Sequence, residues 1–148
     1  MSVLDSVYEK ARLNPQRVAF PEAANEKIMQ AAYEMGKEGY ICPILVGNAA
    51  ELRELCQERG YEESIFKFVD INDEEYRSAL INAYLKLPVC FLSEKSLLRK
   101  MKNPLYFAIV MQAVDEADVT FAGIDNTTGD VILAGQTIVG LKEGISTI

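Results

Sequence analysis

The chain has 148 residues, of which 49% are apolar and 25% are charged. This length is enough for one domain that buries roughly 70% of the surface of its unfolded chain. The net charge of −7 argues against a nucleic-acid-binding surface, which requires clustered basic residues. Because the sequence contains no histidine, His-dependent nucleophile pairs and His-based metal sites are excluded, and we predict no metal site.

We identify no signal for export or membrane insertion in the sequence. The N-terminus is charged and helical in pattern, without the apolar core of a secretory signal. No apolar run approaches the roughly 18 residues of a membrane span. The three cysteines are too widely spaced to suggest a disulfide framework or a zinc site: Cys42, Cys56 and Cys90. We therefore expect a cytoplasmic protein with reduced thiols.

Predicted helices and strands alternate along the whole chain. Apolar residues at helical spacing predict helices over 2–13, 24–38, 49–59, 73–86, 93–102 and 104–116. Short apolar or β-branched runs predict strands over 17–20, 41–46, 65–69 and 118–124, and another that begins at Ile145. The run over 87–92 suits either a strand or a buried connection. The alternation predicts an α/β fold of three layers, in which helices flank a mostly parallel sheet.

The stretch from 117 to 140 combines a predicted strand, a polar turn and a helix from Asp130 onward. The turn contains small, hydroxyl-bearing and amide residues that leave backbone N–H groups free: Asn126, Thr127, Thr128 and Gly129. Open α/β sheets bind ligands at the carboxyl ends of their strands, and helix N-termini attract anions. The stretch therefore predicts an anion site, and phosphate is the anion that we expect there.

The same turn also has a purely structural interpretation. Thr127 and Asp130 have the spacing of a capping box, in which the two side chains satisfy N–H groups at a helix start. Spacing alone favours this cap. The two interpretations are compatible if Thr127 caps the helix while Thr128 and the backbone face a ligand.

Other candidate site residues have structural explanations. Glu22 and Glu26 could form a carboxylate pair, but they are four residues apart at a predicted helix start, where acidic side chains stabilise the helix dipole. Cys90 lies in an apolar run and is expected in the core. From the residues alone we assign no catalytic residue.

Three segments together resemble the phosphate acetyl/butyryltransferase family, the phosphotransacetylases. They read RVAFPEAANEKIMQAA at 17–32, ICPILVGN at 41–48 and NPLYFAIVMQAVDEADVTFAGIDNTTGDVILAGQTIVG at 103–140. In the family, a strand leads into Pro-Glu, a second strand ends in Gly-Asn, and a buried helix precedes a strand and a Ser/Thr-Thr turn. The order and spacing of the three segments agree with this pattern over nearly the whole chain.

The resemblance implies acyl transfer between coenzyme A and inorganic phosphate, acyl-CoA + Pi ⇌ acyl phosphate + CoA. It implies a cytoplasmic homodimer whose subunits have two α/β domains with the active site in the cleft between them. The expected partners are the small-molecule substrates acyl-CoA, phosphate and acyl phosphate, with coenzyme A as a substrate and no cofactor. Residues 1–148 are expected to form a single α/β domain, the N-terminal part of such an enzyme, since the sequence ends inside a predicted strand.

The resemblance also suggests roles for individual residues. The family's phosphate-facing turn falls on Thr127 and Thr128, and Ser146 falls near a strand of small residues that lines the cleft. The family's Arg-Pro in the helix after the turn corresponds to Leu133 and Ala134. The alternative hypothesis is a non-catalytic α/β module that binds a phosphorylated ligand or coenzyme A, or that mediates dimerisation.

Overall fold

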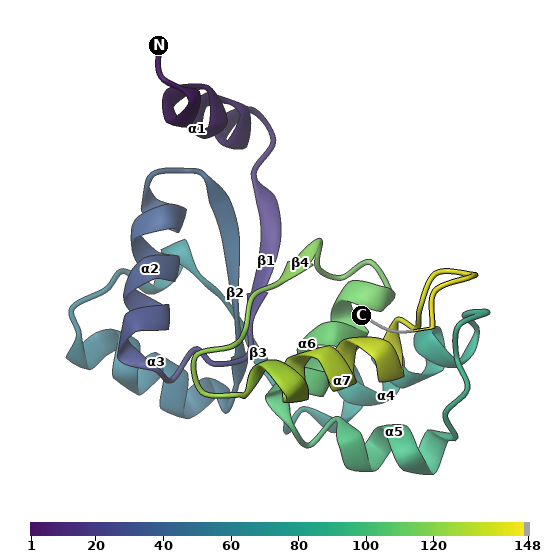
Figure 1. Cartoon of the computed structure of the whole chain (residues 1–148). Coiled ribbons are helices and arrows are strands. Elements are labelled where there is room, and N and C mark those ends of the chain that lie inside the picture. Colours follow the sequence, from purple (N-terminus) through teal and green to yellow (C-terminus); the bar gives the residue numbers. More distant parts are fainter. Residues whose placement is uncertain (147–148) are drawn as a thin grey trace.

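The computed structural model describes residues 1–146, and a four-stranded parallel sheet lies at its centre (Figure 1). The strands lie in the order β3-β2-β1-β4, and each neighbouring pair is parallel. Their bounds are Gln16–Phe20 for β1, Ile41–Gly47 for β2, Lys67–Asp70 for β3 and Val119–Thr120 for β4. The chain therefore builds the sheet from β1 to β3 in one direction and then places β4 on the other side of β1.

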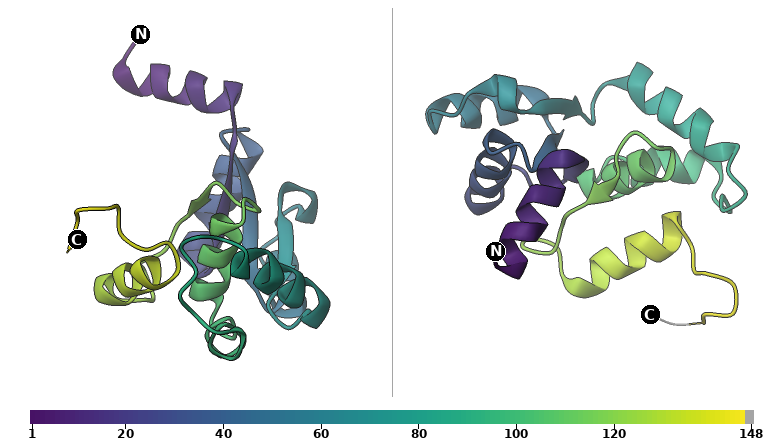
Figure 2. Two further views of the ribbon diagram at one scale, coloured as in Figure 1. Left: turned by 90° about the vertical axis from the view of Figure 1, so that its right-hand side faces the viewer. Right: turned by 90° about the horizontal axis from the view of Figure 1, so that it is seen from above.

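Helices cover both faces of the sheet, which gives the three predicted layers (Figures 1 and 2). One face carries α2 (Glu26–Lys37) and α3 (Ala49–Glu58). The other side of the sheet carries four helices: α4 (Glu74–Leu85), α5 (Glu94–Lys100), α6 (Pro104–Ala113) and α7 (Thr128–Ile138). Of these, α6 lies against the strands, and α7 packs on α6.

Alternate side chains of β1 and β2 enter two separate cores. Ala19, Ile44 and Val46 belong to the core beneath α6, whereas Phe20 and Leu45 belong to the core beneath α2 and α3. All five are at most 6% exposed. Because both faces are buried, these strands are nearly continuous apolar runs in the sequence, as is typical of parallel sheets. The predicted α/β class is confirmed.

Helix α6 is buried on nearly all sides, as its apolar composition predicts. Asn103 caps it by accepting a hydrogen bond from the N–H of Leu105 at 2.9 Å. Pro104 takes the first helical position, where a missing N–H costs no helical hydrogen bond. Six of its residues are buried: Leu105, Phe107, Ala108, Ile109, Val110 and Met111.

Helix α1 (Val3–Leu13) stands apart from the layers, beyond the amino ends of β1 and β2 (Figure 1). None of its residues is buried, and Val3 and Leu4 on its apolar side are 82% and 64% exposed. An ion pair of 3.0 Å between Arg12 and Glu38 holds it to the loop before β2. The predicted amphipathic helix is confirmed, and within residues 1–146 its apolar side is largely exposed, although the ring of Tyr8 lies 4.8 Å from that of Tyr40.

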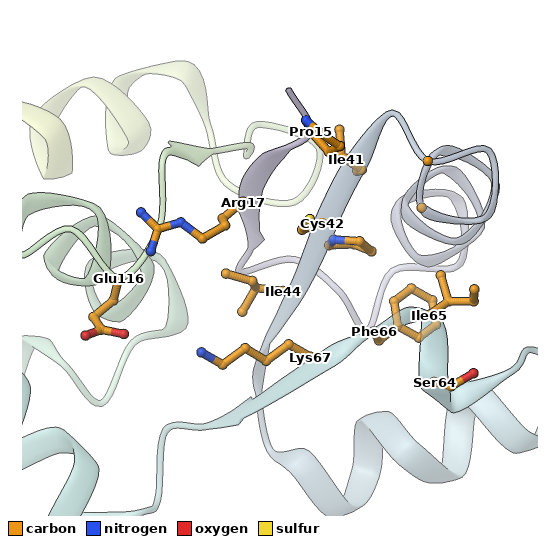
Figure 3. A pocket seen from close by; sticks show the side chains of 13 residues that line it. Pro15, Arg17, Ile41, Cys42, Ile44, Ser64, Ile65, Phe66, Lys67 and Glu116 are labelled. Carbon is orange, nitrogen blue, oxygen red and sulfur yellow. The ribbon is translucent and has the colours of Figure 1, made fainter. Parts of the chain in front are cut away.

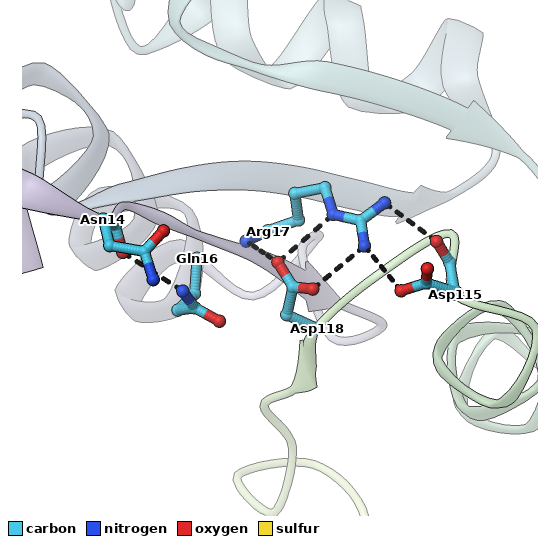
Figure 4. A network of polar contacts seen from close by, with 5 residues as sticks. All are labelled: Asn14, Gln16, Arg17, Asp115 and Asp118. Carbon is cyan, nitrogen blue, oxygen red and sulfur yellow. Dashed lines mark hydrogen bonds and ion pairs between the residues drawn. The ribbon is translucent and has the colours of Figure 1, made fainter.

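A charged network joins the amino ends of β1 and β4 (Figure 4). The Arg17 guanidinium donates to the Asp118 carboxylate at 2.9 and 3.2 Å, and to the side-chain and backbone oxygens of Asp115 at 3.0 and 2.9 Å. The backbone N–H of Arg17 also donates to Asp118, at 2.8 Å. The hydrogen bonds from the Arg17 side chain and backbone hold the pKa of Asp118 below its usual range. Side chains therefore reinforce the β1–β4 pairing at this end.

Strand β4 differs most from the sequence prediction. The sequence predicted a strand over 118–124, but only Val119 and Thr120 are paired with β1 as a strand. The N–H of Phe121 makes one more bond to β1, 2.9 Å from the Ala19 carbonyl oxygen, before the chain turns away. The N–H groups of residues 123–126 donate to a side chain instead. Helix α7 begins at Thr128, two residues before its predicted start.

Smaller predictions are corrected as well. The segment 87–92 is a connection, not a strand, and β3 begins at Lys67 after a single 3-10 turn (Glu63–Ile65). Helix α2 begins at Glu26, because residues 21–24 form a turn and Asn25 is the cap. Ile145 and Ser146 belong to no strand, and residues 147–148 of that predicted strand lie outside the described residues.

Two helical glycines allow a matched test of packing. A Cβ at Gly36 would lie 2.8 Å from side-chain atoms of both Ile65 and Pro43, whereas a Cβ at Gly135 would meet nothing within 4 Å. Gly36→Ala should therefore lower the free energy of unfolding by about 1–3 kcal/mol through overpacking. Gly135→Ala should raise it by about 0.5–1 kcal/mol, because alanine favours the helix. Urea denaturation followed by circular dichroism measures both, and effects of the same sign would contradict this difference in packing at the two glycines.

Candidate functional site

The carboxyl ends of β1 and β4 lie side by side, and the loops that follow them meet. β2 lies on one side of β1 and β4 on the other, so the strand order reverses at this point. Open α/β sheets bind ligands in the crevice outside the carboxyl ends of the strands at such a switch point. The loops 21–25 and 121–127 occupy this position (Figure 1).

The carboxylate of Glu22 fills the space between these loops. Its Oε1 accepts hydrogen bonds from the N–H groups of Gly123 at 2.6 Å and Ile124 at 3.1 Å. Its Oε2 accepts from the N–H groups of Asp125 at 2.7 Å and Asn126 at 2.6 Å, and from the Asn126 side chain at 3.1 Å. Four consecutive backbone N–H groups therefore converge on one carboxylate. We call residues 123–126 the amide cradle.

Glu22 is only 5% exposed and remains charged. Burial by itself raises the pKa of a carboxyl group, because it disfavours the charged form. The hydrogen bonds from the four N–H groups of the cradle outweigh this effect and lower the pKa of Glu22 to about 2. No lysine or arginine forms an ion pair with Glu22 in the described part of the chain. Backbone and amide dipoles therefore compensate the buried charge.

Asn25 provides a second link between the two loops. Its side-chain nitrogen donates to the Asp125 carboxylate at 3.0 Å. Its side-chain oxygen accepts from the N–H of Lys27, also at 3.0 Å, and so caps α2. One residue thus starts a helix on one face of the sheet and fixes the loop that leads to α7.

The start of α7 forms the capping box that the sequence predicted. The Thr127 hydroxyl oxygen accepts from the N–H of Asp130 at 3.1 Å. The Asp130 carboxylate accepts from the N–H and the hydroxyl of Thr127 at 3.2 and 2.7 Å. Within residues 1–146 the N–H groups of Thr128 and Gly129 have no protein acceptor, as expected for the first turn of a helix.

The predicted site residues are found in two separate places. Asn126 uses both its backbone and its side-chain N–H groups on Glu22, and Thr127 is the helix cap. Thr128 and Gly129 follow directly and are exposed. Ser146 is exposed in the coil that follows α7, eight residues after the last residue of that helix. The structure therefore brings together the residues of the turn, whereas Ser146 lies apart from them.

The sequence did not reveal the role of Glu22. Its spacing from Glu26 predicts a place at a helix start, but it lies in the turn after β1, four residues before the first residue of α2. Two signals are present: an acidic residue two positions after the end of a buried strand, and a polar turn after another strand. The sequence does not state that these two strands are neighbours, and without that information the two signals remain unconnected.

A groove of about 680 Å³ lies at the opposite, amino end of the sheet (Figure 3). Arg17 and Lys67 extend to the same side of the sheet as Glu116, and Cys42 is exposed beside them. The Arg17 guanidinium is already bound by two aspartates. Because open α/β sheets bind ligands at the carboxyl ends of their strands, we assign the candidate site to the Glu22 end.

Residues 1–146 contain neither a candidate metal site nor a candidate membrane-spanning helix. No three cysteine, aspartate or glutamate side chains are grouped so that they could hold a metal ion. In the same residues, each helix is too short or too polar to cross a membrane.

The amide cradle predicts a loss of stability at acid pH. Folding lowers the pKa of Glu22 from 4.5 to about 2, so its contribution is complete above pH 4.5 and is lost as the pH falls toward 2. A shift of this size corresponds to roughly 3 kcal/mol. Glu22→Gln should therefore lower the free energy of unfolding by about 3 kcal/mol at neutral pH, and the difference from the unchanged protein should narrow as the pH falls.

Urea denaturation at a series of pH values measures this difference. Glu26→Gln is the matched control, because Glu26 is exposed and lies four residues away in the same sequence. A Glu22 variant whose stability follows that of the Glu26 variant at all pH values would contradict the assignment.

Comparison with known proteins relates this geometry to a family. A model of the phosphate acetyl/butaryl transferase family matches residues 2–148. Phosphate acetyltransferases of Staphylococcus epidermidis and Staphylococcus aureus are 22% identical over 130 residues, which is 88% of this chain and 40% of each relative. The chain thus spans about two fifths of the length of the curated relatives that it matches.

Solved structures show the same fold. A phosphotransacetylase from Streptococcus pyogenes superposes with a TM-score of 0.86 and 22% identity, over 99% of this chain and 45% of that one. The EutD phosphotransacetylase from Staphylococcus aureus superposes with a TM-score of 0.83 and 21% identity, over 97% of this chain and 43% of that one. With the family model matching nearly every residue, the chain belongs to the phosphate acetyl/butaryl transferase family.

Proposed function

We propose that this chain is part of an acyltransferase that moves an acyl group between coenzyme A and inorganic phosphate, acyl-CoA + Pi ⇌ acyl phosphate + CoA. The supporting observation is the polar turn 126–129 at the switch point of the sheet, in a chain that belongs to the family over residues 2–148. Thr128 offers an exposed N–H and hydroxyl, and Gly129 an exposed N–H, to the phosphate oxygens. Asn126 and Thr127 maintain the turn.

The proposed chemistry is a direct displacement. The thiolate of coenzyme A attacks the acyl carbon of the acyl phosphate, the C–S bond forms, and the C–O bond to phosphate breaks. Phosphate leaves with the bonding electrons, and hydrogen-bond donors at Thr128 and Gly129 stabilise the negative charge on its oxygens. No group is oxidised or reduced in this step. We therefore propose coenzyme A as a substrate and no cofactor.

We propose that the cationic side chains of the phosphate site come from the part of the family's sequence that this chain does not cover. Leu133 stands where the family pattern has an arginine, and it is 55% exposed. Arginine matches phosphate with parallel donors, which neutral groups replace poorly. The chain spans 40% of its curated relatives, and the proposal places the remaining residues of the site in the rest of that length. A cytoplasmic location and a homodimer remain predictions from the family resemblance.

A second candidate function is binding without catalysis. The turn has the Asp130 carboxylate in its first helical turn, which repels a phosphate, and no arginine at position 133. These two observations favour a module that binds a phosphorylated ligand or coenzyme A weakly, or that mediates dimerisation. The two functions differ in whether acyl phosphate is formed.

The test is an assay of the polypeptide as its source organism makes it. Acetyl-, propionyl- and butyryl-CoA are each incubated with phosphate, and release of the coenzyme A thiol is followed. Turnover with any of the three supports the acyltransferase. Absence of turnover, together with calorimetric binding of phosphate or coenzyme A, would replace it with the binding module.

Substitutions of the adjacent residues Thr127 and Thr128 distinguish a helix cap from a phosphate contact. Thr128→Val removes a hydroxyl proposed to bind phosphate and should lower kcat/KM for phosphate about tenfold, while the thermal midpoint stays within the error of the measurement. Thr127→Ala removes the cap and should lower the free energy of unfolding by about 1 kcal/mol. Steady-state kinetics and thermal denaturation of both variants give the comparison, and a Thr128 variant with unchanged kinetics would remove Thr128 from the site.

A further inference from the structure

Among residues 1–146, Glu22 is the one charged side chain that is buried. A carboxylate buried without partners would be too costly to remain charged. Each oxygen of Glu22 accepts two backbone N–H groups at 2.6–3.1 Å, and one also accepts the Asn126 side chain. Successive N–H groups that converge in this way form an anion-binding concavity. Glu22 therefore occupies the cradle as an anion supplied by the protein itself.

The shape of the cradle depends on Gly123. Its φ of 125° lies in a region that L side chains rarely adopt. With this backbone, the N–H groups of Gly123 and Ile124 point to one carboxylate oxygen, and those of Asp125 and Asn126 point to the other. The small and polar residues after β4 therefore build a receptor for a carboxylate before they reach the helix.

The cradle ends where the proposed phosphate turn begins. Asn126 is the last donor to Glu22, and the next residue, Thr127, is the cap of α7. The free N–H groups of Thr128 and Gly129 follow within two peptide units. Their position relative to β1 is therefore fixed through the carboxylate of Glu22.

Glu22 also determines which donors an incoming anion can reach. The four N–H groups of the cradle are occupied, and the negative charge of Glu22 repels a second anion from them. Directly after the cradle in the described chain, the N–H groups of Thr128 and Gly129 have no protein acceptor. A phosphate that approaches the switch point is thereby directed to the start of α7.

We propose that Glu22 is the positioning residue of the phosphate turn: its carboxylate fills the amide cradle 123–126, holds residues 127–129 in place against β1, and keeps substrate anions out of the cradle. The effect on phosphate kinetics rests on the proposed function. The occupation of the cradle by a carboxylate does not, because it depends only on the contacts of Glu22.

The experiment replaces the side-chain carboxylate with a diffusible one. Glu22→Ala removes a CH2–COO⁻ group, which has the shape and charge of acetate. The variant should have a lower thermal midpoint, shifted amide resonances at 123–126, and a KM for phosphate raised about tenfold, with a smaller change in the KM for acyl-CoA. Sodium acetate at constant ionic strength should reverse all three effects.

Three controls isolate the carboxylate. Acetamide has nearly the same shape as acetate without the charge and should not rescue Glu22→Ala. Glu26→Ala removes the same charge from an exposed position and should respond to neither additive. Glu22→Asp keeps the charge but retracts it by one methylene, so it should fold and raise the KM for phosphate by less than Glu22→Ala does. If Glu22→Ala does not fold, the KM of Glu22→Asp for phosphate tests the positioning role instead.

The outcomes separate this proposal from the proposed function. Rescue by acetate but not by acetamide, with the resonances of 123–126 restored, supports the cradle even if the protein has no acyltransferase activity. If the protein is active and neither Glu22 variant changes the KM for phosphate, Glu22 is not a positioning residue. If acetate and acetamide act alike on Glu22→Ala, or if no amide resonance at 123–126 shifts, the carboxylate does not fill the cradle and the proposal fails.

Discussion

The hydrogen bonds between Glu22 and the amide cradle are the contact on which the carboxyl edge of this structure depends. β4 pairs with β1 through two residues, too few to define the path of the loop and helix that follow. Glu22 adds five hydrogen bonds across 101–104 positions of sequence. Burying the carboxylate costs solvation, and the converging N–H groups offset that cost. The result is a charged but rigid junction between two loops.

A second charged contact acts at the other end of the same strand pair. Arg17 binds Asp115 and Asp118 next to the start of β4, and Glu22 binds the residues just after its end. The shortest strand of the sheet is therefore held at both ends by side chains of β1 or of the turn that follows it. At its far end α7 is held by Tyr84, whose hydroxyl donates to the Ile138 carbonyl oxygen at 2.6 Å. These contacts fix the whole segment from β4 through α7.

At the carboxyl edge of the sheet, two successive sets of backbone N–H groups can donate hydrogen bonds to an anion. The first set, at 123–126, is filled by the protein's own carboxylate, and the second, at Thr128 and Gly129, is open. A self-supplied anion next to an open donor pair gives the proposed phosphate turn a defined position without any arginine. The chain spans about two fifths of its curated relatives, and a site built on neutral donors alone agrees with the proposal that its cations lie elsewhere.

Local features of this protein were determined by the sequence itself. The capping box of Thr127 and Asp130 and the buried helix opened by Pro104 follow from residue spacing over a few positions, and both are present. The parallel sheet follows from the alternation of predicted strands and helices along the chain, and it is present as well. The length of β4 and the role of Glu22 were decided by tertiary structure alone. Both depend on β1 and β4 being neighbours, a contact between residues about a hundred positions apart that no local pattern encodes. The pairing of β4 with β1 ends because the N–H groups of 123–126 donate to the buried Glu22 carboxylate and not to a neighbouring strand.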